Sequence, residues 1–194
     1  SSWSLTLTIE SGTTIPLGNS PTLTLVNTST GGYGAHPYNL VNNGTITIGT
    51  GKLTTNINGA FTNNGTITGS NTSWIINGDF INAGTVTMSS ATTFDLNAYY
   101  NYYNGNTGTL TINASSTFIS ASNPIISVNG SFIVDNSSTF PTNVSLILDG
   151  SIAINTSINA PGYSFSTPVI INRIASISSW SLTLTIESGT TIPL

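Results

Sequence analysis

The sequence contains few charged residues and no cysteine, and these absences exclude several classes of protein. Charged side chains make up 4% of the 194 residues, with two basic residues, six acidic residues and one histidine. An ordinary soluble domain carries about 25% charged residues. Because so few basic groups are present, nucleic acid and anionic membranes are not expected partners. The lack of cysteine excludes disulfides and thiolate metal sites.

Patterns for catalysis and metal binding are also missing. No two of the acidic residues lie within twelve positions of each other; they are Glu10, Asp79, Asp95, Asp135, Asp149 and Glu187. Carboxylate catalysis on sugars uses paired groups, and calcium-binding solenoids carry an Asp in each nonapeptide turn. We therefore expect no enzyme activity, no cofactor and no metal site. His36, in the Gly-rich stretch 28–37, is expected to be an ordinary surface residue.

Helical and membrane-spanning patterns are absent as well. No apolar stripe with a period of 3.6 residues persists, and no apolar run approaches the roughly 18 residues of a membrane span. No signal peptide is recognisable, so we interpret the chain as a mature protein or a fragment. These observations leave an all-β protein without a membrane span as the expected class.

Hydroxyl and amide side chains supply the polarity that charge does not. Ser and Thr together number 61 and Asn numbers 24, and apolar residues alternate with them along much of the chain. Residues 3–9, WSLTLTI, alternate with a period of two, which is typical of a strand. Gly12 and the stretch 16–21 interrupt this pattern, and a second strand is expected at 22–26. A net charge of −4 and abundant β-branched residues favour a folded chain over a disordered one.

An internal repeat organises the middle of the sequence. INGAFTNNGTIT at 57–68 and INGDFINAGTVT at 76–87 are identical at eight of twelve positions, and LVNNGTIT at 40–47 fits the same frame. Repeats of about 20 residues that cannot bury an apolar face alone must stack to form a core. The sequence therefore predicts a β-solenoid, a parallel β-helix of roughly 20-residue coils. The stretch 98–106, AYYNYYNGN, is read as an insertion.

The repeat frame also predicts which side chains lie inside. Ile46, Ile67 and Val86 should point inward while the flanking Thr residues point outward, and the repeat glycines should allow turns with positive φ. Phe61 and Phe80 should stack in register, with Leu40 one coil earlier. One repeated amide position is expected to form a ladder along the stack, as in cross-β assemblies; its members are Asn42, Asn63 and Asn82.

The two ends of the chain are duplicates. Residues 178–194 repeat residues 1–17 without a difference, so the chain has a period of 177, or roughly nine coils. We consider 1–177 one β repeat unit and 178–194 the start of the next tandem unit, because strand-like alternation continues through the seam. Two alternatives remain open. The copy is a donor strand of a pilin-like β-sandwich, or an artefact rather than part of the natural chain.

The tandem and donor-strand interpretations both predict contacts between subunits. An uncapped coil exposes backbone donors and acceptors together with the apolar edge of the strand. The residues expected to make these contacts are Trp3, Leu5, Leu7 and Ile9 in the first copy and Trp180, Leu182, Leu184 and Ile186 in the second. The predicted partner of the chain is therefore another copy of itself.

Residues 40–88 resemble a known group of proteins. The runs NNGTITIGTG, FTNNGTITGS and FINAGTVTM are similar to the β-solenoid repeats of secreted microbial surface proteins, the haemagglutinin-like and autotransporter-like adhesins. They also resemble low-charge filament and surface-layer proteins of prokaryotes. The resemblance implies parallel coils, an extracellular or cell-surface location and a structural or adhesive role. It transfers no catalytic residue.

Covalent glycans are a further expectation. A chain outside the cell with so little charge needs another source of hydration, which sugars would supply. The Asn-X-Ser/Thr sequons number nine, no more than this composition predicts by chance. The candidate acceptors are Asn27, Asn43, Asn64, Asn71, Asn113, Asn129, Asn136, Asn143 and Asn155.

Two functions are compatible with these features. The first is a structural protein that forms an extracellular filament or surface fibre by end-to-end stacking of strands. The alternative is an adhesin-type binding module that recognises glycans or ice. It would use either the recurring Thr-X-Thr pairs, such as Thr45/Thr47, or the tyrosine cluster within 99–103. The Thr-X-Thr spacing is uneven, so a regular array requires insertions to absorb the difference.

Overall fold

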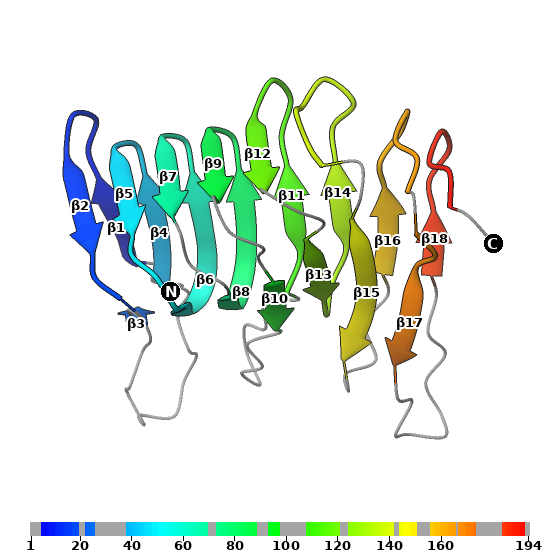
Figure 1. The fold of residues 1–194 in the computed structure, drawn as a ribbon, viewed down its shortest axis with the longest axis horizontal. Helices are drawn as coiled ribbons and strands as arrows, with labels where there is room; N and C mark the ends of the chain where they lie inside the picture. Colours follow the sequence, from blue (N-terminus) through cyan, green and yellow to red (C-terminus); the bar gives the residue numbers. More distant parts are fainter. Residues whose placement is uncertain are drawn as a thin grey trace, which may run out of the picture.

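The computed structural model describes residues 5–19, 22–25, 38–69, 73–88, 93–97, 108–120, 124–141, 144–150, 156–165, 167–173 and 184–192. These residues form strands and turns, and none of them belongs to a helix that could cross a membrane. Each strand pairs in parallel with strands of the adjacent turns of the chain. The chain is a β-solenoid, as the repeat predicted, and not a β-sandwich. Figure 1 shows its turns stacked from the N-terminal to the C-terminal end.

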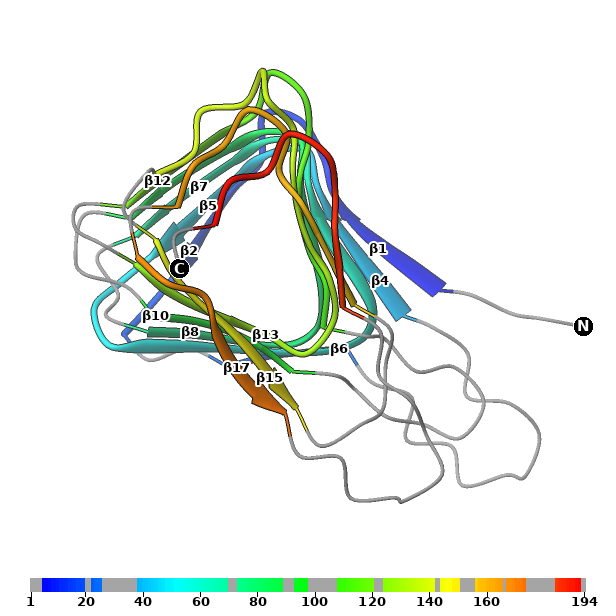
Figure 2. The same cartoon turned by 90° about the vertical axis from the view of Figure 1, so that its right-hand side faces the viewer.

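The turns run along three faces, and Figure 2 shows the triangular section end-on. Face 1 holds β1 (Leu5–Ile9), β4 (Tyr38–Asn42), the second halves of β6 (Lys52–Asn63) and β8 (Ser73–Asn82), β11 (Leu110–Ile112), β14 (Phe132–Val134), β16 (Thr156–Asn159) and β18 (Leu184–Ile186). Face 2 holds β2 (Thr14–Leu17), β5 (Thr45–Ile48), β7 (Thr66–Gly69), β9 (Thr85–Met88) and β12 (Thr117–Ser120). Face 3 holds β3 (Thr22–Leu25), the first halves of β6 and β8, β10 (Thr93–Asn97), β13 (Ile125–Val128), β15 (Ser145–Gly150) and β17 (Ile170–Arg173).

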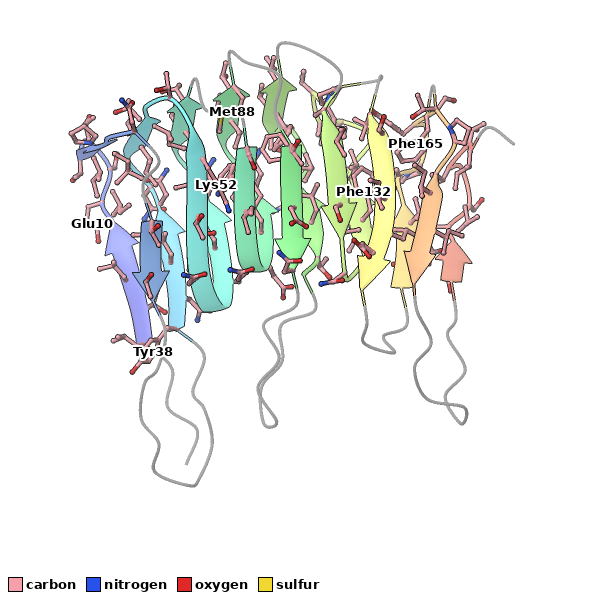
Figure 3. The ribbon with its side chains drawn as sticks, turned by 60° about the horizontal axis from the view of Figure 1, so that its bottom comes forward. Glu10, Tyr38, Lys52, Met88, Phe132 and Phe165 are labelled. Carbon is pink, nitrogen blue, oxygen red and sulfur yellow. The ribbon has the colours of Figure 1, made fainter. Side chains whose placement is uncertain are left out.

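Alternation along each strand builds a continuous apolar interior (Figure 3). Ile46, Ile67 and Val86 are buried and their Thr neighbours are only partly so, as predicted. Aromatic rings run along the axis with centroids 4.7 to 6.0 Å apart, from Phe61 and Trp74 to Phe118. Tilted and edge-to-face contacts of this kind are favourable beyond the area they bury.

The predicted register on face 1 is confirmed. Leu40 pairs with Phe61 and Phe61 with Phe80, at steps of 21 and 19 residues. Other steps along the same column are longer, from 26 to 33 residues, for example between Leu7 and Leu40. Longer connections lie between strands and leave the stacking intact. Face 1 therefore has eight described turns instead of the nine expected from a constant 20-residue coil.

The repeat glycines are required for a reason other than the predicted one. Gly44, Gly65 and Gly84 do not adopt positive φ. A Cβ on Gly65 would meet the Gly44 carbonyl of the preceding turn, and one on Gly84 would meet that of Gly65. The prediction of a left-handed turn at these positions was wrong, because it considered the local backbone only. Close approach of neighbouring turns is the actual constraint.

The predicted amide ladder is confirmed. Asn42 Nδ2 donates to Asn63 Oδ1 at 2.7 Å, and Asn63 Nδ2 donates to Asn82 Oδ1 at 2.8 Å. All three side chains are buried, so the ladder satisfies groups that would otherwise be costly inside the core. The three residues sit where the chain turns from face 1 to face 2, just before the repeat glycines.

A second amide ladder was not predicted. On face 3, Asn77 Nδ2 donates to Asn56 Oδ1 at 2.6 Å and Asn97 Nδ2 donates to Asn77 Oδ1 at 3.3 Å. The sequence repeat aligns Asn77 with Asn58, yet Asn77 pairs with Asn56 because the register between β6 and β8 shifts between Asn56 and Ala60. A bulge at this corner thus places face 3 two residues out of the repeat frame.

Proline at position 16 also differs from expectation. The sequence predicted a break from this residue onward, but Pro16 lies within β2 and pairs with Thr47. β2 is at the end of its sheet, and no described strand pairs with its other edge. An edge strand tolerates proline because the missing N–H is not needed for pairing.

Candidate assembly surfaces

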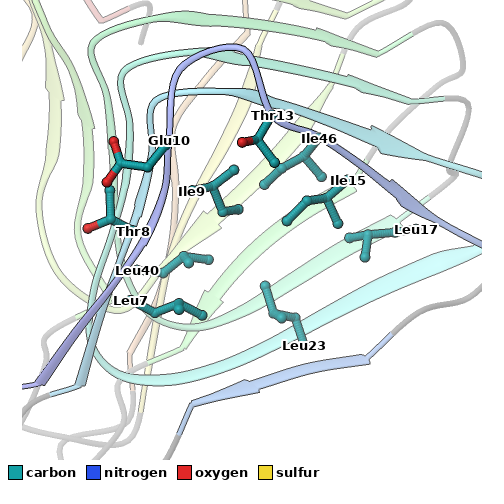
Figure 4. A pocket seen from close by; sticks show the side chains of 10 residues that line it. All are labelled: Leu7, Thr8, Ile9, Glu10, Thr13, Ile15, Leu17, Leu23, Leu40 and Ile46. Atoms are coloured by element: carbon teal, nitrogen blue, oxygen red, sulfur yellow. The ribbon is translucent and has the colours of Figure 1, made fainter.

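The first turn of the solenoid has an open edge. β1, β2 and β3 each pair with the following turn, and no described strand pairs with their opposite edges. Leu5 is 55% exposed and Leu7 46% exposed, whereas Ile9 is buried against the next turn. The inward side chains surround a hollow of about 280 Å³, shown in Figure 4. This end of the core is therefore accessible and apolar.

The last described turn shows how another turn covers a comparable edge. β18 pairs with β16, which places Ser157 opposite Thr185 and Ile158 opposite Ile186. The Glu187 N–H donates to the Ile158 carbonyl at 2.9 Å. Ile158 is fully buried, while Ile186 remains 51% exposed on its other side.

Contacts at the following corner and on face 2 complete this junction. The Ala160 N–H donates to Thr190 Oγ1 at 2.9 Å, and the Gly162 N–H donates to the Gly189 carbonyl at 2.8 Å. The Thr191 N–H donates to the Tyr163 carbonyl at 3.0 Å. Backbone and side chain thus both contribute to seating residues 184–192 on the turn formed by residues 156–165.

The two copies of the duplicated sequence have the same local conformation. In each, a Thr N–H closes a turn onto a Glu carbonyl, at 3.1 Å for Thr13 and Glu10 and 3.2 Å for Thr190 and Glu187. The glycine in this turn has φ of 82° in the first copy and 87° in the second. Positive φ is required here, unlike at the repeat glycines. The identical sequences therefore fold into the same corner at both ends.

The copies use opposite edges. The first copy pairs with the turn that follows it, since the Asn43 N–H donates to the Ile9 carbonyl at 2.8 Å. The second copy pairs with the turn that precedes it through Glu187 and Thr191. Burial differs accordingly, at 8% exposure for Ile9 and 51% for its counterpart Ile186. Of the other predicted contact residues, Leu184 lies on β18, and Trp3, Trp180 and Leu182 are outside the described residues.

The candidate glycosylation sites gather along one corner of the prism. Asn43, Asn64 and Asn113 occupy equivalent positions where face 1 turns into face 2, as the bonds from their N–H groups to the preceding turn show. Asn136 follows the equivalent residue of its own turn. Asn64, Asn113 and Asn136 are exposed, and Asn43 and Asn129 are partly buried. Asn27, Asn71, Asn143 and Asn155 lie outside the described residues.

Threonine ranks form on face 2. Thr45, Thr66, Thr85 and Thr117 pair in one row, and Thr47, Thr68 and Thr87 pair in a second. The longer connections absorb the uneven spacing seen in the sequence. The Thr-X-Thr pairs at 6/8 and 22/24 lie on faces 1 and 3 instead. The Tyr residues of 99–103 and His36 are outside the described part of the chain.

The described carboxylates do not assemble a catalytic or metal centre. Within the ranges that the structure describes, no three His, Cys, Asp or Glu residues lie close enough to share a metal ion. Asp135 closes a local turn, accepting from Ser137 Oγ at 2.7 Å and from the Ser137 N–H at 2.8 Å. These two bonds lower the pKa of the Asp135 carboxyl.

The chain matches no known family model, no curated protein and no solved structure.

Proposed function

We propose that this chain is a structural protein that builds an extracellular filament or surface fibre by end-to-end stacking of its strands. The observation that supports the proposal is the relation between the duplicated ends. The first copy has an open strand edge, and the second copy is seated by that same edge on another turn of the solenoid. A chain that contains both halves of such a contact is suited to join further copies of itself.

Physical features of the stack favour a mechanical role. Backbone hydrogen bonds run along the axis, and amide ladders on two corners reinforce them inside the core. Unpaired edges are a hazard for a monomer and a means of assembly for a fibre. In this proposal the chain has no catalytic step, and glycans at the exposed corner keep the low-charge surface hydrated.

Electron microscopy and light scattering of the purified full chain over a wide concentration range test the proposal. We expect rods of constant width whose length increases with concentration. Leu7→Lys should suppress growth by placing a charge on the open edge. Ile125→Lys is the matched control, because Ile125 is exposed to a similar extent, 43% against 46%, but lies on the side of the stack. A chain that stays monomeric at every concentration would contradict the proposal.

The threonine ranks on face 2 support the alternative of a binding module for ice or glycans. They present hydroxyls in two parallel rows over three consecutive turns. Thr66→Lys should then abolish arrest of ice growth or glycan retention, whereas Thr62→Lys on face 1 should not. If the unmodified chain shows neither activity, this alternative is excluded.

A further inference from the structure

We propose that the first turn of one chain and the C-terminal segment of another compete for the same surface, so that chains join by exchange. We call residues 184–192 the C-terminal segment and residues 156–165 the acceptor turn. In the structure the C-terminal segment covers the acceptor turn of its own chain. When chains join, β1 and β2 of a second copy take its place. The inference rests on the proposed function and specifies the partner and the regulation of assembly.

Sequence identity makes the two occupants interchangeable. Every residue of the C-terminal segment has an identical counterpart 177 positions earlier. Thr8 would therefore lie opposite Ser157, and Ile9 opposite Ile158, as Thr185 and Ile186 do now. At the corner, Thr13 Oγ1 would accept the hydrogen bond that Thr190 Oγ1 now accepts from Ala160.

The edge of the first turn has the correct backbone groups for this contact. Successive residues of a strand direct their N–H and C=O groups to opposite edges. The Ile9 carbonyl accepts from the next turn, so the groups of Glu10 face the open edge. The Glu187 N–H, its counterpart, is the group that donates to Ile158 in the C-terminal segment. The donor needed for exchange is thus already oriented on β1.

Apolar surfaces on the two sides also match. Leu7 lies half exposed at the rim of the hollow in the first turn, which opens toward the missing neighbour. On the acceptor turn, Ile158, Ala160 and Phe165 are buried beneath the C-terminal segment. Release of that segment would expose them, and the first turn of a second copy would cover them again.

The exchange is closely balanced because the same contacts are lost and gained. Two differences favour the joined state. The first turn is already held in place by pairing of β1 with β4 and of β2 with β5, and joining covers an edge that otherwise stays exposed. The C-terminal segment acts against joining because it is tethered to the surface for which it competes. Its occupancy of the acceptor turn sets the concentration at which chains join.

Proline substitutions at equivalent positions give opposite outcomes. Glu187→Pro removes the N–H that donates to Ile158 and weakens the C-terminal segment alone. We expect the concentration needed for assembly to fall by about tenfold, the effect of about 1.4 kcal/mol. Glu10→Pro removes the same group from the incoming edge and should raise that concentration by about tenfold or more. Alanine at each position controls for the lost charge, and circular dichroism checks folding.

Disulfide trapping identifies the contact directly, since the sequence has no cysteine. Thr8→Cys with Ser157→Cys should form disulfides between chains and give ladders on a denaturing gel. Ser157→Cys with Thr185→Cys should close a bond within the chain and block assembly until it is reduced. Neighbouring strands bring paired residues within the range that a disulfide spans. Thr8→Cys with Thr111→Cys, in the middle of face 1, controls for random collision.

The outcomes separate this inference from the proposed function. Ladders from the first cysteine pair only, together with opposite effects of the two prolines, support exchange. Assembly without ladders, with both prolines behaving alike, overturns exchange and leaves the filament proposal standing. Absence of assembly in every folded variant, Glu187→Pro included, overturns both.

Discussion

Asn63 offers a stringent test of the buried amide ladder. Its side chain is fully buried, and its Nδ2 donates to Asn82 Oδ1 at 2.8 Å and to the Thr85 carbonyl at 3.2 Å. Its Oδ1 accepts from Asn42 Nδ2 at 2.7 Å. Aspartate has nearly the same shape but no donor when it is ionised. Asn63→Asp therefore brings a carboxylate oxygen against two acceptor oxygens while leaving packing almost unchanged.

The loss of stability at pH 7 should be large. A buried acceptor left without its donor costs about 1–3 kcal/mol, and an unpaired buried charge costs more until its pKa shifts. We expect a decrease of about 4 kcal/mol in the free energy of unfolding. Because a typical domain is stable by about 5–15 kcal/mol, the variant should remain measurable.

The loss should depend on pH with a definite sign. Burial among acceptors raises the pKa of the introduced carboxyl above its unfolded value of about 3.9. As pH rises past that value the unfolded state releases its proton first, and stability falls by about 1.4 kcal/mol per pH unit until the folded pKa is reached. Below about pH 3.9 the protonated group donates to Asn82 Oδ1, and most of the loss should disappear.

Urea unfolding followed by circular dichroism at pH 3 and pH 7 measures both effects against the unmodified chain. Asn64→Asp is the matched control, because Asn64 is the exposed neighbour and its amide donates to Asn43 at the surface. We expect that control to stay within about 0.5 kcal/mol of the unmodified chain. Equal losses in the two variants, or a loss in Asn63→Asp that is no smaller at pH 3, would refute the reasoning.

Three further predictions concern single side chains. Gly65→Ala should lower stability by about 1–3 kcal/mol, since its methyl group meets the preceding turn, whereas Gly18→Ala, in open space, should not; equal denaturation midpoints would contradict this. Burial raises the pKa of Tyr163, whose hydroxyl is buried without a hydrogen-bond partner, so Tyr163→Phe should raise the free energy of unfolding by about 1 kcal/mol, and a loss would count against it. Protein from its natural source should have an intact mass above 20.1 kDa that falls on Asn113→Gln or Asn136→Gln; a mass equal to that of the sequence would remove the glycan prediction.

Sequence alone was sufficient for the class of fold and for much of its interior. The repeat predicted stacked parallel turns, the column through Leu40, Phe61 and Phe80, and the ladder that contains Asn63. These features follow from a local rule, because alternation sets the face of each side chain and the repeat aligns equivalent positions. Residues with the same spacing in neighbouring turns then meet without further information.

Only the tertiary structure decided the features that depend on which turns are neighbours. Spacing did not reveal that Asn77 pairs with Asn56, because a bulge changes the register on one face and not on the others. The need for glycine at position 65 comes from the carbonyl of the preceding turn and not from its own φ. Identity of the two ends was plain in the sequence, but the edge that each uses was not, because that depends on whether the adjacent turn precedes or follows it.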